Sequence, residues 1–137
     1  MNNTEKLKLL RELKRREKEK IYKKDFAIFA QEQIKILPKD SSKGFIPFEF
    51  NEAQRVVNEK LEEQLRTTGK VRAIILKGRQ MGLSTFTTAR VFWKAYFNAY
   101  HKSVVMAHDS ATSDALFNMS RNTIPYMSED FRHVRIS

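Results

Sequence analysis

One glycine-bearing loop carries the residues best suited to chemistry. It reads Lys77-Gly78-Arg79-Gln80-Met81-Gly82-Leu83-Ser84-Thr85, between an apolar run at 71–76 and a stretch with helical periodicity. In a strand–loop–helix unit, successive backbone N–H groups and a helix N-terminus converge on one anionic site. The pattern therefore predicts a phosphate-binding loop, with the Lys77 ammonium near the phosphates and the Ser84 hydroxyl on Mg²⁺.

The loop departs from the usual phosphate-loop pattern G-x-x-x-x-G-K-[ST]. When Gly82 is aligned with the second glycine, Ser84 takes the hydroxyl position, Leu83 replaces the usual lysine and Lys77 replaces the first glycine. The Lys77 stem is long enough to fold back over the phosphates. The alternative is a glycine-containing turn with two surface cations, Lys77 and Arg79.

The elements that would position this loop are two strands and the helix between them. Residues 71–76 are apolar on both faces except at Arg72, which is typical of a buried parallel strand. Residues 103–107 form a second short apolar run, and the connection is long enough for a right-handed crossover. We therefore expect an α/β protein, an incomplete P-loop NTPase-type parallel sheet flanked by helices, with an N-terminal basic helical extension.

The helix predicted over 85–100 carries large apolar side chains along one side. Such rings can stack on bases, but their helical spacing favours core packing, where each buried ring contributes roughly 1.5–3 kcal/mol. The residues concerned are Phe86, Ala89, Trp93, Tyr96, Phe97 and Tyr100.

Upstream, the periodicity predicts two more helices separated by an extended segment. The first covers 25–37 and ends before Pro38. Residues 45–50 are aromatic and extended, and Pro47 argues against a central strand. The second helix starts after Asn51 as N-cap, runs to about residue 66 and stops at 67–69, where Gly69 suits the left-handed position past a helix end.

Downstream, we expect a further helix and the start of another strand. Asp109 or Ser110 caps the helix, which runs to about residue 122 with Ala115, Leu116 and Met119 facing inward, and Pro125 breaks it. Residues 131–137 are expected to begin a third strand. The expected domains are a basic helical leader, 1–24, and the N-terminal portion of a P-loop ATPase domain, 25–137.

Composition restricts the classes of function. The formal charge of +10 favours polyanionic partners such as nucleic acid, and the leader holds ten Lys/Arg against four Glu. The leader is either a solvated basic helix or an arm that docks on DNA or a partner. The absence of cysteine fits a reducing compartment, no apolar run predicts a membrane span, and His101, His108 and His133 lack metal-ligand spacing.

The loop 77–85 resembles the deviant phosphate loop of the large terminase subunits of tailed bacteriophages and herpesviruses. In that family an Arg-Gln-x-Gly core is common, and some members place the lysine at the start of the loop, as here. Residues 48–54 are similar to the segment that holds the family's adenine-contacting glutamine. Residues 104–108 resemble the next strand of the ATPase.

The resemblance implies a DNA-packaging motor that uses ATP and Mg²⁺ to push double-stranded DNA into a capsid. It implies a bacterial cytoplasm as location, with the small terminase subunit, the portal and further copies of the motor as partners. Lys77 would neutralise the β/γ-phosphates, Arg79 would sense or stabilise phosphate charge, and Ser84 would bind Mg²⁺. The remaining nucleotide contacts carried over are Gln54 at the adenine edge and Gly78, Gln80, Met81, Gly82, Leu83 and Thr85 at the phosphates.

Other interpretations stay open at this point. Gln54 lies three residues after Asn51, so it can instead complete a capping box. Glu129-Asp130 has the wrong order and context for the acidic motif of ATP hydrolysis, so we expect no turnover from this chain alone. The alternatives to a terminase are a helicase-like nucleic-acid ATPase, and a non-enzymatic basic DNA-binding or assembly protein whose glycine loop is accidental.

Overall fold

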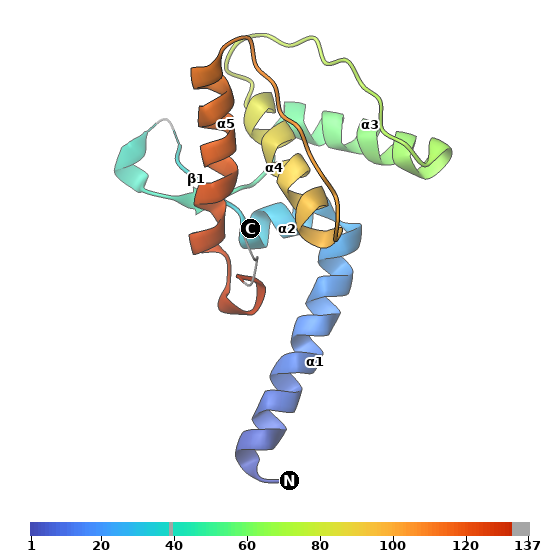
Figure 1. Ribbon diagram of the computed structural model, residues 1–137, viewed down its shortest axis with the longest axis vertical. Coiled ribbons are helices and arrows are strands. Elements are labelled where there is room, and N and C mark those ends of the chain that lie inside the picture. The colour runs from blue at the N-terminus through green and yellow to red at the C-terminus, as the bar shows by residue number, and fades with distance from the viewer. Residues whose placement is uncertain (39, 133–137) are drawn as a thin grey trace.

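The computed structural model describes residues 1–38 and 40–132, and this part of the chain is mostly helical (Figure 1). Its single sheet has two short antiparallel strands, with Lys35 opposite Pro47 and Ile36 opposite Ile46. The elements in chain order are α1 Asn3–Lys24, α2 Phe26–Gln33, β1 Lys35–Ile36, η1 Ser41–Lys43, β2 Ile46–Pro47, α3 Glu52–Thr68, α4 Leu83–Phe97, α5 Ser110–Thr123, η2 Ile124–Tyr126 and η3 Glu129–Phe131.

The predicted parallel P-loop sheet is wrong. Residues 71–76 and 103–107 are extended, but neither forms part of a strand ladder with the described residues. Ile74 and Leu76 are 94% and 95% exposed, where a buried strand was expected. An apolar run becomes a parallel strand only when neighbouring strands take up its N–H and C=O groups, and no described segment does so here.

An aromatic cluster forms the core in place of a sheet. It joins the end of α1, α2, the segment before α3, one face of α4 and the C-terminal turns. Tyr22 contacts Phe131 with ring centroids 5.1 Å apart, and Phe26 contacts Phe86 at 5.5 Å. The Trp93 indole N–H donates to the Tyr22 carbonyl at 2.6 Å. The buried rings are Tyr22, Phe26, Phe29, Phe48, Phe50, Phe86, Trp93 and Phe131.

The helix expected over 25–37 is shorter than predicted. Asp25 caps α2, which ends at Gln33, and the following residues enter the small sheet. The Phe48 N–H donates to the Ile34 carbonyl at 3.0 Å, so pairing with the aromatic segment replaces the last helical turn. Tertiary contacts here override a favourable helical pattern.

The helix after Asn51 is confirmed, with a capping box at its start and left-handed Gly69, φ 70°, at its end. The helix expected over 85–100 is confirmed in part, since α4 covers Leu83–Phe97 and buries Phe86 and Trp93. Tyr100 lies beyond α4, fully exposed, with φ 66°, so its predicted core position is wrong.

The C-terminal turns close over the first helices. Of the two predicted caps, Asp109 caps α5, and Pro125 lies in η2. Ala115, predicted to face inward, is exposed. Gln33 Oε1 accepts hydrogen bonds from the Ser128 N–H and hydroxyl, both at 3.0 Å. Phe131 lies in the turn η3 and not in a strand, and the rest of the predicted third strand, 133–137, is outside the described residues, as is His133.

Candidate nucleotide-binding loop

The loop 77–85 is a sharp bend from an extended segment into α4. Gln80 and Gly82 have φ of 63° and 69°, so two left-handed residues turn the chain within three positions. Gly82 is the N-cap of α4, and no side chain caps this helix end. The Phe86 N–H donates to the Gly82 carbonyl at 3.0 Å, which leaves the N–H groups of the first three helical residues without a partner inside the helix.

These first-turn N–H groups can donate hydrogen bonds to a bound anion. Leu83, Ser84 and Thr85 supply them, and no hydrogen bond between described residues uses them as donors. The partial positive charge at the N-terminus of a helix adds to their effect. The predicted bend is therefore present, although the strand expected before it is not.

Gln54 holds the loop against the start of α3. Its Oε1 accepts from the Asn51 N–H at 2.9 Å, and its Nε2 donates to the Gly82 carbonyl at 2.8 Å. Asn51 Nδ2 also donates to the Met81 carbonyl at 3.2 Å. Gln54 is only 3% exposed, so its capping-box and loop contacts occupy both ends of its amide. Adenine contact by Gln54 stays a prediction, and it requires these two bonds to open.

The charged residues of the loop lie at its solvent side. Lys77 and Arg79 are exposed, and no ion pair within the described ranges involves either one. Ser84 is exposed, whereas Leu83 is buried under the first turn of α4. The loop thus presents two cations, a hydroxyl and backbone N–H donors without a carboxylate, a donor set that suits a phosphate chain.

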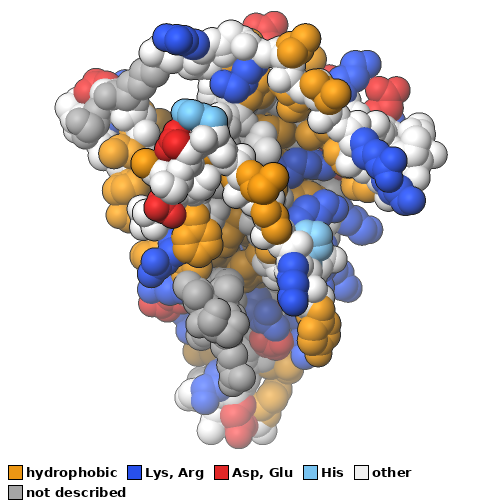
Figure 2. All heavy atoms as spheres, turned by 45° about the horizontal axis from the view of Figure 1, so that its top comes forward, with side chains coloured by type: hydrophobic (Ala, Val, Ile, Leu, Met, Phe, Trp, Pro, Cys, Tyr) orange, Lys and Arg blue, Asp and Glu red, His pale blue; other side chains and the backbone are white. Residues whose placement is uncertain are grey.

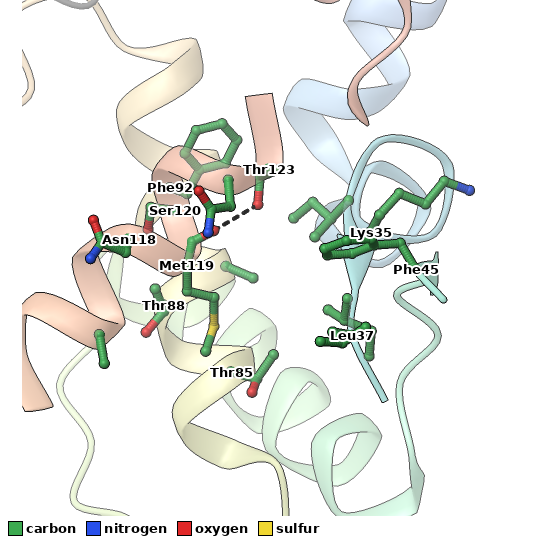
Figure 3. Close-up of a pocket in the computed structure, with 15 residues that line it drawn as sticks. Lys35, Leu37, Phe45, Thr85, Thr88, Phe92, Asn118, Met119, Ser120 and Thr123 are labelled. Carbon is green, nitrogen blue, oxygen red and sulfur yellow. Dashed lines mark hydrogen bonds between the residues drawn. The ribbon is translucent and has the colours of Figure 1, made fainter. Parts of the chain in front are cut away.

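A separate apolar cavity lies beside α4 (Figure 3). Its volume is about 330 Å³, and Thr85 is the one predicted site residue in its lining. Thr88 and Met119 face it from α4 and α5, while the Lys35 ammonium points away from it. The cavity can accept a small apolar group, but it does not enclose the loop.

Sequence reasoning missed a buried cation that fixes α4 against α3. Arg90 is 7% exposed, lies 2.7 Å from a Glu62 carboxylate oxygen and donates to Asn58 Oδ1 at 3.1 Å. Its guanidinium also lies over the rings of Phe26 and Trp93, at 5.6 and 5.4 Å from their centroids. Nothing in the sequence distinguished Arg90 from the other surface-type cations, since its partners come from another helix.

The described residues contain no cluster of three or more His, Asp or Glu side chains arranged to hold a metal ion. No helix in the described ranges has both the length and the apolar character needed to cross a membrane.

Comparison with known proteins gave no matching family model, no similar curated protein and no similar solved structure.

Proposed function

We propose that the loop 77–85 binds the triphosphate of ATP, together with Mg²⁺, as the nucleotide-binding part of a terminase-type DNA-packaging motor. The observation that carries this proposal is the bend at Gln80 and Gly82, which leads into the uncapped N-terminus of α4 with two exposed cations at its start. The motif resemblance supplies the choice of ATP and of the motor.

Each part of the loop has a distinct role in this proposal. The N–H groups of the first turn of α4 hold the phosphate oxygens, because those donors have no other partner among the described residues. Lys77 balances the charge of the outer phosphates, and Arg79 contacts the terminal one. Ser84, the second residue of α4, provides a hydroxyl for Mg²⁺. Double-stranded DNA, a small terminase subunit and a portal remain partners proposed from the resemblance.

The proposal is tested by titrating the full chain with a fluorescent ATP analogue and Mg²⁺. We expect saturable binding that weakens about tenfold or more in Lys77→Ala, since one charge-assisted contact to phosphate is lost. Ser84→Ala should weaken binding only when Mg²⁺ is present. Lys70→Ala removes an equally exposed cation outside the loop and should leave the affinity within about twofold.

The fluorescence of Trp93 shows whether each variant is folded, because this residue is the only tryptophan and is buried. A folded wild-type chain without saturable binding would reject the proposal. An equal loss of affinity for the ATP analogue in Lys77→Ala and Lys70→Ala would also reject the proposal, because binding would then reflect net charge alone.

A second candidate function is that of a basic nucleic-acid-binding or assembly protein. It is favoured by α1, which projects from the body as a long helix and holds ten Lys/Arg against four Glu (Figure 1). This reading predicts duplex DNA binding that weakens steeply with salt and is unaffected by Lys77→Ala. Charge reversal at Lys6, Lys8 and Arg11 should abolish it, whereas these changes should not alter ATP-analogue binding.

A further inference from the structure

The two extended segments that were expected to be strands border a single groove. Val71, Ala73 and Ile75 line one side of it, only Ser103 of the second segment reaches it, and most of the other lining residues belong to α4. The groove has a volume of about 350 Å³. Its lining is Leu61, Val71, Ala73, Ile75, Phe86, Thr87, Arg90, Val91, Lys94, His101 and Ser103.

The first segment shows the alternation of a strand with one side against the groove, whereas residues 103–106 are all exposed. Ala73 and Ile75 line the groove, whereas Ile74 between them is 94% exposed. In the second segment Val104 and Met106 are 81% and 85% exposed, and Val105 between them is 37% exposed. Period-two alternation places side chains on opposite faces of an extended chain. Residues 71–76 therefore have the form of a strand without a partner among the described residues.

The backbone groups of these segments are largely unpaired within the described residues. Within 1–38 and 40–132, no backbone–backbone hydrogen bond involves residues 71–76 or 103–107. The exceptions use side chains: Gln64 bonds both the N–H and the C=O of Arg72, at 2.8 and 3.0 Å, and Ser113 Oγ accepts from the Ala107 N–H at 3.2 Å. Exposed strand edges of this kind are templates on which another extended backbone can pair.

The charge around the groove selects the partner. From Gln64 to His108 the chain has eight Lys/Arg and neither Asp nor Glu. Of the two cations in the lining, Arg90 is paired with Glu62, whereas Lys94 has no ion pair among the described residues. On this face basic and hydrophobic side chains are interspersed (Figure 2). A second copy of the chain would bring the same positive charge to the groove and would be repelled, whereas acidic residues on the incoming segment would be attracted.

We infer that the groove bordered by residues 71–76 binds an extended segment of another protein, with alternating apolar side chains and acidic flanks, by strand addition. The incoming backbone pairs with the N–H and C=O groups of residues 71–76 other than those of Arg72, which Gln64 already bonds. Its alternate side chains contact Thr87 and Val91 of α4, and its acidic ends approach Lys70 and Lys102. This interaction does not depend on nucleotide binding by the loop.

The test uses a fluorescein-labelled peptide, Asp-Glu-Val-Thr-Ile-Thr-Val-Thr-Ile-Glu-Asp, and fluorescence anisotropy with the full chain. We expect saturable binding and a loss of about tenfold or more when alternate amides of the peptide are N-methylated, because strand pairing needs those donors. Polyglutamate of equal charge and duplex DNA should bind more weakly than the peptide.

Matched valine substitutions locate the site. Val91→Arg places a long side chain in the groove and should lower peptide affinity about tenfold or more, despite adding positive charge. Val56→Arg makes the same change on an exposed position of α3 outside the groove and should leave the affinity within about twofold. If Val91→Arg does not fold, Ile74→Glu provides a fully exposed variant that should weaken binding by charge repulsion.

Some results would overturn the inference. One is equal affinity for the peptide and its N-methylated form, which would mean that no backbone pairing occurs. Another is equal binding of polyglutamate or of duplex DNA, which would show a general polyanion surface. An equal loss of peptide affinity in Val91→Arg and Val56→Arg would show that the peptide does not bind in the groove.

Discussion

Gly82 is the position at which the geometry of the loop makes the sharpest quantitative prediction. It has φ 69°, a conformation that disfavours residues with a side chain, and a Cβ there would lie 2.7 Å from Gln54 Nε2. Gly69 provides a matched control, because its φ is 70° and a Cβ there would have nothing within 4 Å. Alanine at either position introduces the same left-handed strain, but alanine at 82 also displaces Gln54.

The expected magnitudes follow from these contacts. Left-handed strain destabilises an alanine by about 1 kcal/mol at both positions. Gly82→Ala also breaks the hydrogen bond from Gln54 Nε2 to the residue 82 carbonyl and leaves a buried amide without a partner, a further 1–2 kcal/mol or so. We therefore expect Gly82→Ala to lower the free energy of unfolding by about 2–3 kcal/mol and Gly69→Ala by about 1 kcal/mol.

The assay is urea denaturation followed by the fluorescence of Trp93. In a Gln54→Ala background the clash is absent, so Gly82→Ala should then destabilise by only about as much as Gly69→Ala. If Gly82→Ala and Gly69→Ala have equal effects in the wild-type chain, Gln54 does not pack against the loop and the site geometry is wrong.

Three other predictions concern titratable contacts. Burial and the nearby Glu19 carboxylate raise the pKa of Tyr96 to about 12. The stability contributed by neutral Tyr96 is therefore present below the ordinary tyrosine pKa and is lost as pH rises through about 12. Tyr96→Phe removes the hydrogen bond from the Tyr96 hydroxyl to the Phe131 carbonyl, at 2.6 Å. It should lower the free energy of unfolding by about 1 kcal/mol near neutral pH and flatten the fall in stability at alkaline pH. Denaturation at a series of pH values measures both effects. The Tyr22 hydroxyl donates to Glu32 and lowers the pKa of that carboxyl. The stability that this contact contributes is therefore present above the usual glutamate pKa and is lost as pH falls through the lowered value. Glu32→Gln should show a smaller loss of thermal stability between about pH 6 and pH 3 than the wild type. Hydrogen bonding from the Thr112 N–H lowers the pKa of Asp109, and Asp109→Ala should speed amide hydrogen exchange in the first turn of α5 while α3 is unaffected.

Local features of the candidate site were predictable because neighbouring residues produce them. The bend from an extended segment through Gly82 into a helix follows from glycine, hydroxyl and apolar spacing within a few positions. The Asn51–Gln54 spacing indicated a capping box, and the structure contains it. What spacing could not predict is that the same Gln54 also bonds the loop, 28 residues away.

The fold class was not predictable in the same way. The apolar run at 71–76 has the composition of a buried strand, but burial depends on which other segments reach its edges. Here the aromatic residues of α1, α2 and the turns at 124–131 pack on one face of α4, and no described segment pairs with the run. The exposed Tyr100 shows the same limit, because α4 ends at Phe97 before its periodicity does.

By itself, the sequence determined the positions of α1 and α3, the caps at Asn51 and Asp109, the helical aromatic stripe of α4 and the bend at the loop. Each of these depends on contacts between residues close along the chain, where residue type largely fixes the backbone. Only the tertiary structure decided that the core is an aromatic helical cluster, that Arg90 is buried against α3, and that the apolar run 71–76 borders an open groove. Those outcomes depend on which distant segments meet, and the free energy of such contacts is not encoded in any one stretch of sequence.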